Sequence, residues 1–276
     1  MQPRTAGTFV VLTFAISWAI WLAMIAGGVS IATTPGLVLN VVATAGPSIA
    51  AVLLAIRLGG AELSRLAAGF SLSLLSVRWV VVAVVLPLLM VGAAIAISVG
   101  GLDAAVPVVS GVVVGRIVVE FVRVLFLGGP LQEELGWRGF LLPRLQAKRS
   151  AFTASIVLGL IWGLWHIPLY FVLGTGQYET AASAGVTFAI AAFVVWTMGL
   201  SVLFTWLFNE TGGSLVIAIL FHVAVNLAAF VPAAVGSPGA ASFLYPLITW
   251  IVALIVAARY GRENLASRPR VVVEAS

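Results

Sequence analysis

The sequence predicts an all-α integral membrane protein with about eight transmembrane helices. Of its 276 residues, 62% are hydrophobic and only 8% are charged, whereas about 25% of the residues of a soluble domain are charged. The apolar runs are unbroken over about 20 residues, the length that crosses the hydrocarbon core as a helix. They lack the alternation over about ten residues that is typical of barrel strands. We therefore interpret residues 1–276 as a single polytopic membrane domain.

The spans follow one another through nearly the whole chain. We expect them near 8–31, 36–58, 78–99, 106–128, 152–173, 184–207, 212–233 and 241–259. The first run is too long for the core of a cleaved signal peptide, which has roughly 7–15 residues, so we interpret it as a span. Residues 59–77 form the longest cytoplasmic connection, in which we expect a short interfacial helix.

The charges between the spans predict the orientation. If Arg4 is cytoplasmic, alternation puts every basic cluster inside and leaves Asp103 and Glu179 in the outer loops. By the positive-inside rule both termini are then cytoplasmic, in the inner or plasma membrane of the cell. The net charge of +5 indicates contact with lipid headgroups and does not imply a nucleic-acid partner. The polar tail, 261–276, is expected to be loosely ordered.

The fourth span is predicted to be broken at Gly128-Gly129-Pro130. Proline has no backbone N–H, and it disfavours helical geometry in the residue before it. Proline is, however, well suited to the first turn of a new helix. We therefore expect a second helical segment to begin at Pro130 and to carry Glu133, Glu134 and Arg138.

These three charged residues lie close together in a sequence that otherwise avoids charge. On a helix, Glu134 and Arg138 are at positions i and i+4, in the order that favours an ion pair. Glu133 points about 100° away from Glu134 and has no local partner. It is therefore a candidate general base that acts on water.

The only two histidines, His166 and His222, each lie inside an apolar segment. Asn226 is one turn beyond His222 and shares its helix face. Taken singly, these side chains are as readily explained by hydrogen bonds between helices. Because a charge at mid-bilayer costs about 2.5–3.5 kcal/mol or more, we expect the glutamate and both histidines to share one solvated pocket. The chain contains no cysteine, which excludes disulfides, thiolate metal sites and a cysteine nucleophile.

Three motifs in this order resemble those of a known family. They are Glu133-Glu134-x-x-x-Arg138, an aromatic residue (Trp162) four positions before His166, and Phe221-His222-x-x-x-Asn226. They resemble the motifs of the CPBP family, the CAAX proteases and bacteriocin-processing enzymes, which is also called the Abi family and consists of multi-spanning intramembrane endopeptidases. The resemblance covers about 115–235. Trp162 stands where the family usually has phenylalanine, so an aromatic wall is kept.

The resemblance implies a hydrolase that cleaves a peptide bond in a membrane-associated protein or peptide. Glu133 and His166 would activate water, while His222 and Asn226 would donate hydrogen bonds to the oxyanion. Glu134, Arg138 and Trp162 would support them.

A metal stays open as a cofactor. Glu133, His166 and His222 could together hold Zn²⁺ and leave one position for water, although no His-Glu-x-x-His pair is present. The resemblance does not decide this, because the family is described both as metalloproteases and as metal-independent glutamate proteases.

The substrate is expected to be a peptide or protein segment at the cytoplasmic leaflet, or one that enters sideways from the lipid bilayer. Eukaryotic relatives cleave a prenylated C-terminal tail, whereas the composition here suggests a bacterial protein. The alternative is a non-catalytic immunity factor or a transporter that uses the same polar cluster to bind a peptide or ion. Against transport, the sequence has no matching pair of Gly/Pro-broken spans in its two halves.

Overall fold

The computed structural model describes residues 2–101, 106–107, 110–236 and 240–273, and within these ranges the chain forms helices and connections without strands. The all-α prediction is confirmed by the helices of these ranges. Asp103, which was predicted to lie in an outer loop, falls outside the described residues. The elements are α1 (Gln2–Ala26), α2 (Thr34–Thr44), α3 (Gly46–Leu58), α4 (Gly60–Ala68), η1 (Leu72–Leu74), α5 (Val77–Gly101), α6 (Gly111–Leu127), α7 (Pro130–Glu134), η2 (Leu135–Leu141), α8 (Leu142–Gln146), α9 (Ala151–Trp165), η3 (Ile167–Tyr170), α10 (Gly176–Ala184), α11 (Val186–Glu210), α12 (Leu215–Ala234) and α13 (Ala241–Tyr260).

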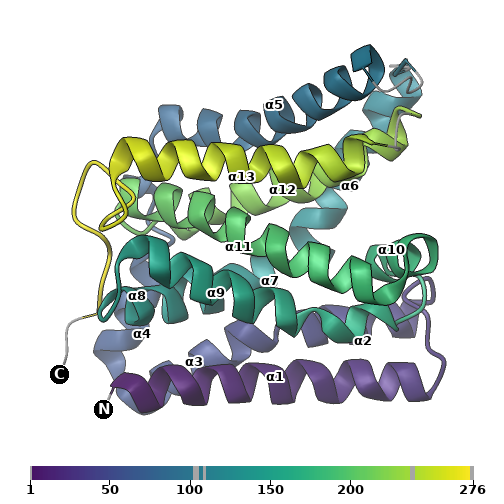
Figure 1. Ribbon diagram of the computed structural model, residues 1–276. Helices are drawn as coiled ribbons and strands as arrows, with labels where there is room; N and C mark the ends of the chain where they lie inside the picture. Colours follow the sequence, from purple (N-terminus) through teal and green to yellow (C-terminus); the bar gives the residue numbers. More distant parts are fainter. Residues whose placement is uncertain (1, 102–105, 108–109, 237–239, 274–276) are drawn as a thin grey trace.

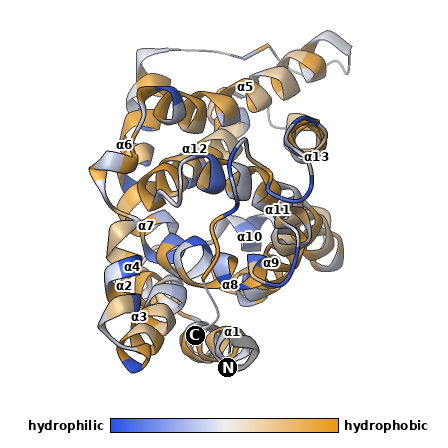
Figure 2. Ribbon diagram, turned by 90° about the vertical axis from the view of Figure 1, so that its left-hand side faces the viewer, coloured by the Kyte–Doolittle hydropathy of each residue, from blue (hydrophilic) through white to orange (hydrophobic). Residues whose placement is uncertain are grey.

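The long helices lie roughly side by side, and both chain termini are at the same end of the bundle (Figure 1). Helix α1 packs against α2 and α3, α9 packs against α11, and α12 packs against α5. Helix α13 covers α11 and α5. Seen from the end with the termini, most helices are hydrophobic, while hydrophilic segments lie in the connections of that end (Figure 2). This pattern fits helices surrounded by lipid.

The protein is a multi-pass membrane protein, but the predicted count of eight spans is not confirmed. Five single helices in the described residues are long and apolar enough to cross a membrane, namely Thr5–Ala26, Val77–Gly101, Val186–Glu210, Leu215–Ala234 and Ala241–Tyr260. The pair α2 and α3, bent by 44°, adds a sixth if it is one span. The predicted spans 106–128 and 152–173 are shorter helices. Helix α6 has 17 residues and carries three charges, and α9 ends after 15 residues, just before a turn that contains Pro168.

The predicted break after α6 is confirmed. Helix α6 ends at Leu127, Gly129 has a φ of +104°, and α7 begins at Pro130. The chain then widens into a π-helical turn, η2, before it returns to α-helical geometry in α8. Such π-helical turns are rare and are frequent at functional sites.

Two segments pack against the end of the bundle that carries the termini. One is the connection from α3 to α5, and the other is the C-terminal tail. Helix α4 is the short helix expected in 59–77. The expectation of a loose tail is wrong for 261–273. Ser267 donates from its backbone N and its Oγ to the two carboxylate oxygens of Glu210, both at 2.8 Å, and the amide of Gln146 donates to the Val271 carbonyl at 2.8 Å. The tail therefore satisfies polar groups that this end of the bundle buries.

Glu62 on α4 provides a pH test of this end of the fold. Its carboxylate accepts hydrogen bonds from Arg65 at 2.6 Å and from Arg144 of α8 at 2.9 Å. Burial alone would raise the pKa of Glu62, but the two guanidinium groups outweigh burial and hold this pKa below its ordinary value. Because the folded-state pKa is lowered, the carboxylate stabilises the fold above the unfolded-state pKa, and this contribution is lost as the pH falls.

We expect Glu62→Gln to lower the free energy of unfolding at pH 7. The difference from the unaltered protein should begin to shrink as the pH falls below 4.5, the ordinary pKa of the group, since the carboxylate is then neutralised in the unfolded state. It should vanish only below the lowered folded-state pKa, where the carboxylate is neutral in both states. Thermal unfolding in detergent at pH 7 and pH 4 measures this. Glu263→Gln, at a carboxylate with 66% exposure, is the control. A difference that stays the same at both pH values would contradict the prediction.

Candidate active site

Trp162 connects the candidate residues of three helical segments. Its indole Nε1–H donates to Glu133 Oε2 at 2.8 Å, and its backbone carbonyl accepts from His166 Nδ1 at 2.7 Å. Its ring also lies edge-on to the imidazoles of His166 and His222, with centroid distances of 5.6 and 5.4 Å. The structure thus brings together the predicted residues of α7, of the C-terminal end of α9 and of α12.

Glycines on α9 let this helix approach α11 closely, and this approach positions Trp162 and His166. A Cβ at Gly159 would lie 2.5 Å from the Cα of Met198, and one at Gly163 would lie 2.5 Å from Thr197 Oγ1. Thr197 also donates to the Gly159 carbonyl at 3.0 Å. Helices α9 and α11 therefore pack with their backbones nearly in contact, as small residues allow in membrane helices.

The carboxylate of Glu133 is held through one of its two oxygens. Oε2 accepts from the indole N–H groups of Trp162 at 2.8 Å and Trp137 at 3.2 Å. Within the described part of the chain, no hydrogen bond reaches Oε1. This oxygen lies beside Gly129, where a Cβ would be only 2.2 Å away, so the glycine makes room for it. One oxygen of a buried carboxylate is thus fixed while the other stays free to take a proton.

Glu134 forms the predicted ion pair with Arg138, at 2.9 Å between Oε1 and Nη1, and both side chains are fully buried. The guanidinium also lies over the ring of Phe204, 3.7 Å from its centroid. The structure adds a contact that the sequence reading missed, because the same Oε1 accepts from His222 Nδ1 at 2.7 Å. These residues are 88 positions apart, and no local pattern in the sequence indicates the contact. Glu134 therefore orients a histidine as well as bracing its own helix.

The hydrogen bonds fix which ring nitrogens carry protons. A carbonyl can only accept, so His166 carries a proton on Nδ1, and its Nε2 presents a lone pair when the ring is neutral. His222 donates from Nδ1 to a carboxylate, which leaves its Nε2 for a further partner. The Asn226 amide, one turn along α12, is 3.4 Å from the Gly128 carbonyl, which is long for a hydrogen bond.

Five of the seven candidate side chains line one cavity of about 170 Å³, and the Glu134–Arg138 pair lies outside its wall. Its wall includes Glu133, Trp162, His166, His222 and Asn226. The shared pocket expected from the sequence is therefore present, with a carboxylate, two imidazoles and an amide around the same space. Polar groups that converge in a cavity can bind a small polar molecule such as water.

The expected zinc ligands do not form a metal site as they are placed. In the described ranges, no group of three or more His, Cys, Asp or Glu side chains is arranged to hold a metal ion, and zinc requires ligand distances of about 2.0–2.2 Å. Glu133, for its part, is engaged by two indole N–H groups.

Trp162→Phe tests the hydrogen bond to Glu133, since it keeps an aromatic ring in the wall and removes the N–H together with the five-membered ring of the indole. A hydrogen bond to a charged group contributes about 1.5–3 kcal/mol, so for the peptide cleavage that the sequence resemblance implies we expect kcat to fall about 10-fold to 100-fold with a smaller change in KM. Steady-state kinetics on a peptide substrate measure this. Trp250→Phe, at an indole that donates to the Val195 carbonyl away from the site, should leave kcat unchanged. An unaltered kcat in Trp162→Phe would refute the positioning role.

Comparisons with known proteins point to the same segment. Residues 115–228 match the family model described as Type II CAAX prenyl endopeptidase Rce1-like. A curated protein of Methanococcus maripaludis, CAAX prenyl protease 2, is 38% identical to this chain over 113 residues, which are 39% of this chain and 40% of that protein. The chain thus matches less than half the length of that relative. The segment that matches the family model, 115–228, nevertheless contains all seven candidate site residues.

Proposed function

We propose that this protein is an intramembrane endopeptidase that hydrolyses a peptide bond with water activated by Glu133. The premise is that residues 115–228 belong to the CPBP family of CAAX proteases and bacteriocin-processing enzymes. The observation that carries the proposal is the state of the Glu133 carboxylate. Oε2 is fixed by two indole donors, while Oε1 is left without a hydrogen bond from the described residues beside a cavity that both histidines line.

In the proposed reaction, a water molecule in the cavity is held by the Nε2 lone pair of His166 and loses a proton to Glu133. Its oxygen forms a bond to the carbonyl carbon of the scissile peptide, and the carbonyl electrons move to the oxygen. His222 and Asn226 donate hydrogen bonds to this oxyanion. When the C–N bond breaks, Glu133 returns the proton to the leaving amine. The products are a free carboxylate and a free amine.

Glu134 and Arg138 would act through His222. The Glu134 carboxylate accepts from Nδ1 and so fixes the orientation of the imidazole ring, whose Nε2 would donate to the oxyanion in the proposed reaction. Arg138 balances the buried charge of Glu134. Losing one donor to an oxyanion typically slows catalysis by about 10²–10³, and this is the effect that we assign to His222.

The direct test is cleavage of a fluorogenic peptide library by the purified protein in detergent or lipid nanodiscs. We expect cleavage by the unaltered protein and none by His166→Ala. The rival class, an immunity factor or transporter, predicts no cleavage by either protein, and that result would overturn the proposal.

The metal requirement is tested with the same assay. We propose that catalysis does not depend on a metal, and we expect cleavage to persist after dialysis against a chelator. Loss of activity that added Zn²⁺ restores would instead assign Glu133, His166 and His222 to a zinc site.

A further inference from the structure

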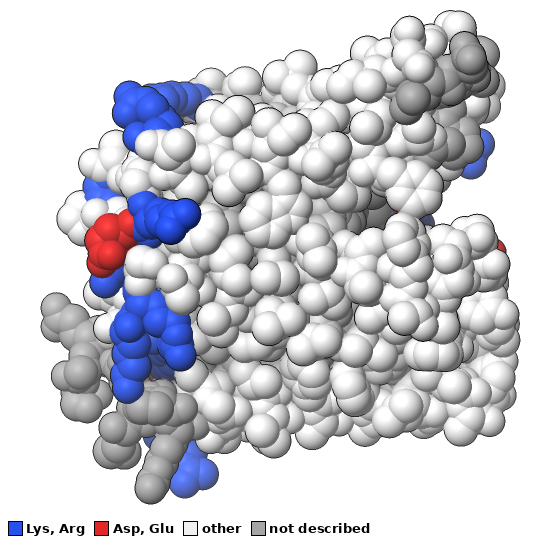
Figure 3. Space-filling view, in the orientation of Figure 1, with Lys and Arg blue, Asp and Glu red and all other residues white. Residues whose placement is uncertain are grey.

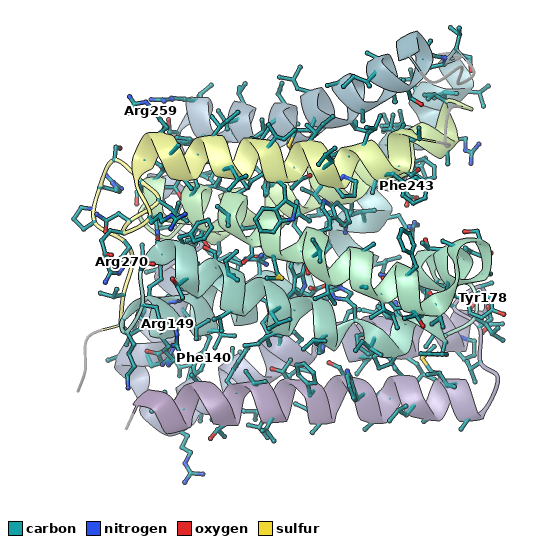
Figure 4. The ribbon with its side chains drawn as sticks, viewed as in Figure 1. Phe140, Arg149, Tyr178, Phe243, Arg259 and Arg270 are labelled. Carbon is teal, nitrogen blue, oxygen red and sulfur yellow. The ribbon has the colours of Figure 1, made fainter. Side chains whose placement is uncertain are left out.

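The two ends of the bundle differ strongly in charge. Arginines and lysine gather at the end that carries both termini, where Figure 3 shows the blue surface and Figure 4 labels Arg149, Arg259 and Arg270. The residues of this basic end are Arg57, Arg65, Arg78, Arg144, Lys148, Arg149, Arg259, Arg262, Arg268 and Arg270. The connections at the opposite end, 27–33, 102–110, 171–185 and 235–240, contain no lysine or arginine. By the positive-inside rule, the basic end faces the cytoplasm.

The candidate catalytic residues lie far from this basic end. Helix α9 starts at the basic end with Ala151, and its 15 residues carry His166 about 22 Å along the bundle, at about 1.5 Å per residue. That is well past the middle of a hydrocarbon core of about 30 Å. Glu133 is at a similar depth, because α7, η2 and α8 must all follow it before the chain reaches Lys148.

The cavity continues from these residues toward the end opposite to the basic end. Its wall also includes Ile31 after α1, Asn40 and Thr44 of α2, Arg123 of α6, and Gly176 and Gln177 at the start of α10. Tyr178, the next residue of α10, marks the end opposite to the arginines in Figure 4. On the same side, Figure 3 shows a hollow between the layer that contains α13 and the layer that contains α10.

We propose that the catalytic cavity opens to the outer, non-cytoplasmic side of the membrane, and that the substrate is a polypeptide segment exposed on that side or in the outer half of the bilayer. The substrate named in this inference rests on the proposed function. The direction in which the cavity opens rests on the charge distribution and on the geometry of the helices. The inference replaces the expectation of a substrate at the cytoplasmic leaflet. A substrate that is held at the cytoplasmic surface would meet the basic end of the bundle. There, α4, η1 and the C-terminal segment 261–273 cover the helices.

Labelling of single cysteines tests the direction without any need for activity, since the chain has no cysteine of its own. Gln177→Cys and Thr44→Cys place a thiol in the cavity wall, and Lys148→Cys places one on the exposed basic end. With a small membrane-impermeant thiol reagent on intact cells, we expect both cavity positions to react. Lys148→Cys should react only after the membrane is opened. The reverse pattern would overturn the inference.

A second measurement tests the substrate side. An impermeant peptide that the purified protein cleaves is added to sealed right-side-out and inverted vesicles that contain the protein. We expect cleavage in right-side-out vesicles, and cleavage confined to inverted vesicles would overturn the inference. If the purified protein cleaves no peptide, the proposed protease function fails, while the cysteine labelling still decides which way the cavity opens.

Discussion

Glu133→Gln is expected to lower kcat of peptide cleavage by about 10²–10⁴, the usual contribution of a general acid–base group. The change keeps the shape of the side chain, but an amide oxygen cannot take a proton from water at neutral pH. The indole N–H groups of Trp137 and Trp162 can still donate to the amide oxygen, so the fold and the cavity should persist. Steady-state cleavage of a fluorogenic peptide measures kcat, and single-turnover cleavage separates the bond-breaking step from product release.

The matched control for this substitution is Glu179→Gln, at an exposed glutamate of α10. It makes the same chemical change outside the site and should retain the kcat of the unaltered protein. Binding of the uncleaved peptide by Glu133→Gln separates the two classes of function further. A protease loses cleavage but keeps binding, whereas a Glu133→Gln protein that cleaves at the normal rate would eliminate Glu133 as the base.

Arg138→Met is expected to lower the free energy of unfolding by about 3–5 kcal/mol, the usual effect of removing one partner of a buried ion pair. The guanidinium and the Glu134 carboxylate are both fully buried, so the substitution leaves a buried carboxylate with only His222 as its partner. It also removes the cation from the face of Phe204. Equilibrium unfolding in detergent measures the loss.

A double variant separates the stability of the pair from its role in catalysis. Replacing a buried ion pair by apolar residues of similar size is often neutral, so Glu134→Leu combined with Arg138→Met should regain most of the lost stability. Activity should not return, since His222 then lacks its acceptor. Arg149→Met, at an exposed arginine, should change stability by less than about 0.5 kcal/mol. A double variant as unstable as Arg138→Met alone would show that the pair is not the source of the effect.

The sequence already predicts features that depend on short stretches of chain. The helical class follows from long apolar runs, the break before α7 follows from the backbone chemistry of Gly129 and Pro130, and the Glu134–Arg138 pair follows from the period of the helix. The likeness to a protease family depends on motifs of this local kind. The count of eight spans was not confirmed, because hydropathy alone does not show that α6 and α9 are short.

The candidate site needed the tertiary structure. The sequence motif predicts only an aromatic wall at Trp162, whereas in the structure its indole N–H also donates to Glu133. The presence of that N–H is the one signal in the sequence that indicates this second role. The bond from His222 to Glu134 joins residues 88 positions apart.

The sequence by itself thus determined the membrane class, the helix break and the set of polar side chains, because the cost of a charge in lipid and the period of a helix act within one segment. Only the tertiary structure decided which oxygen of Glu133 is free and toward which end of the bundle the cavity continues. Those features depend on how closely separate helices pack, and that distance is set by glycine faces such as those of Gly159 and Gly163.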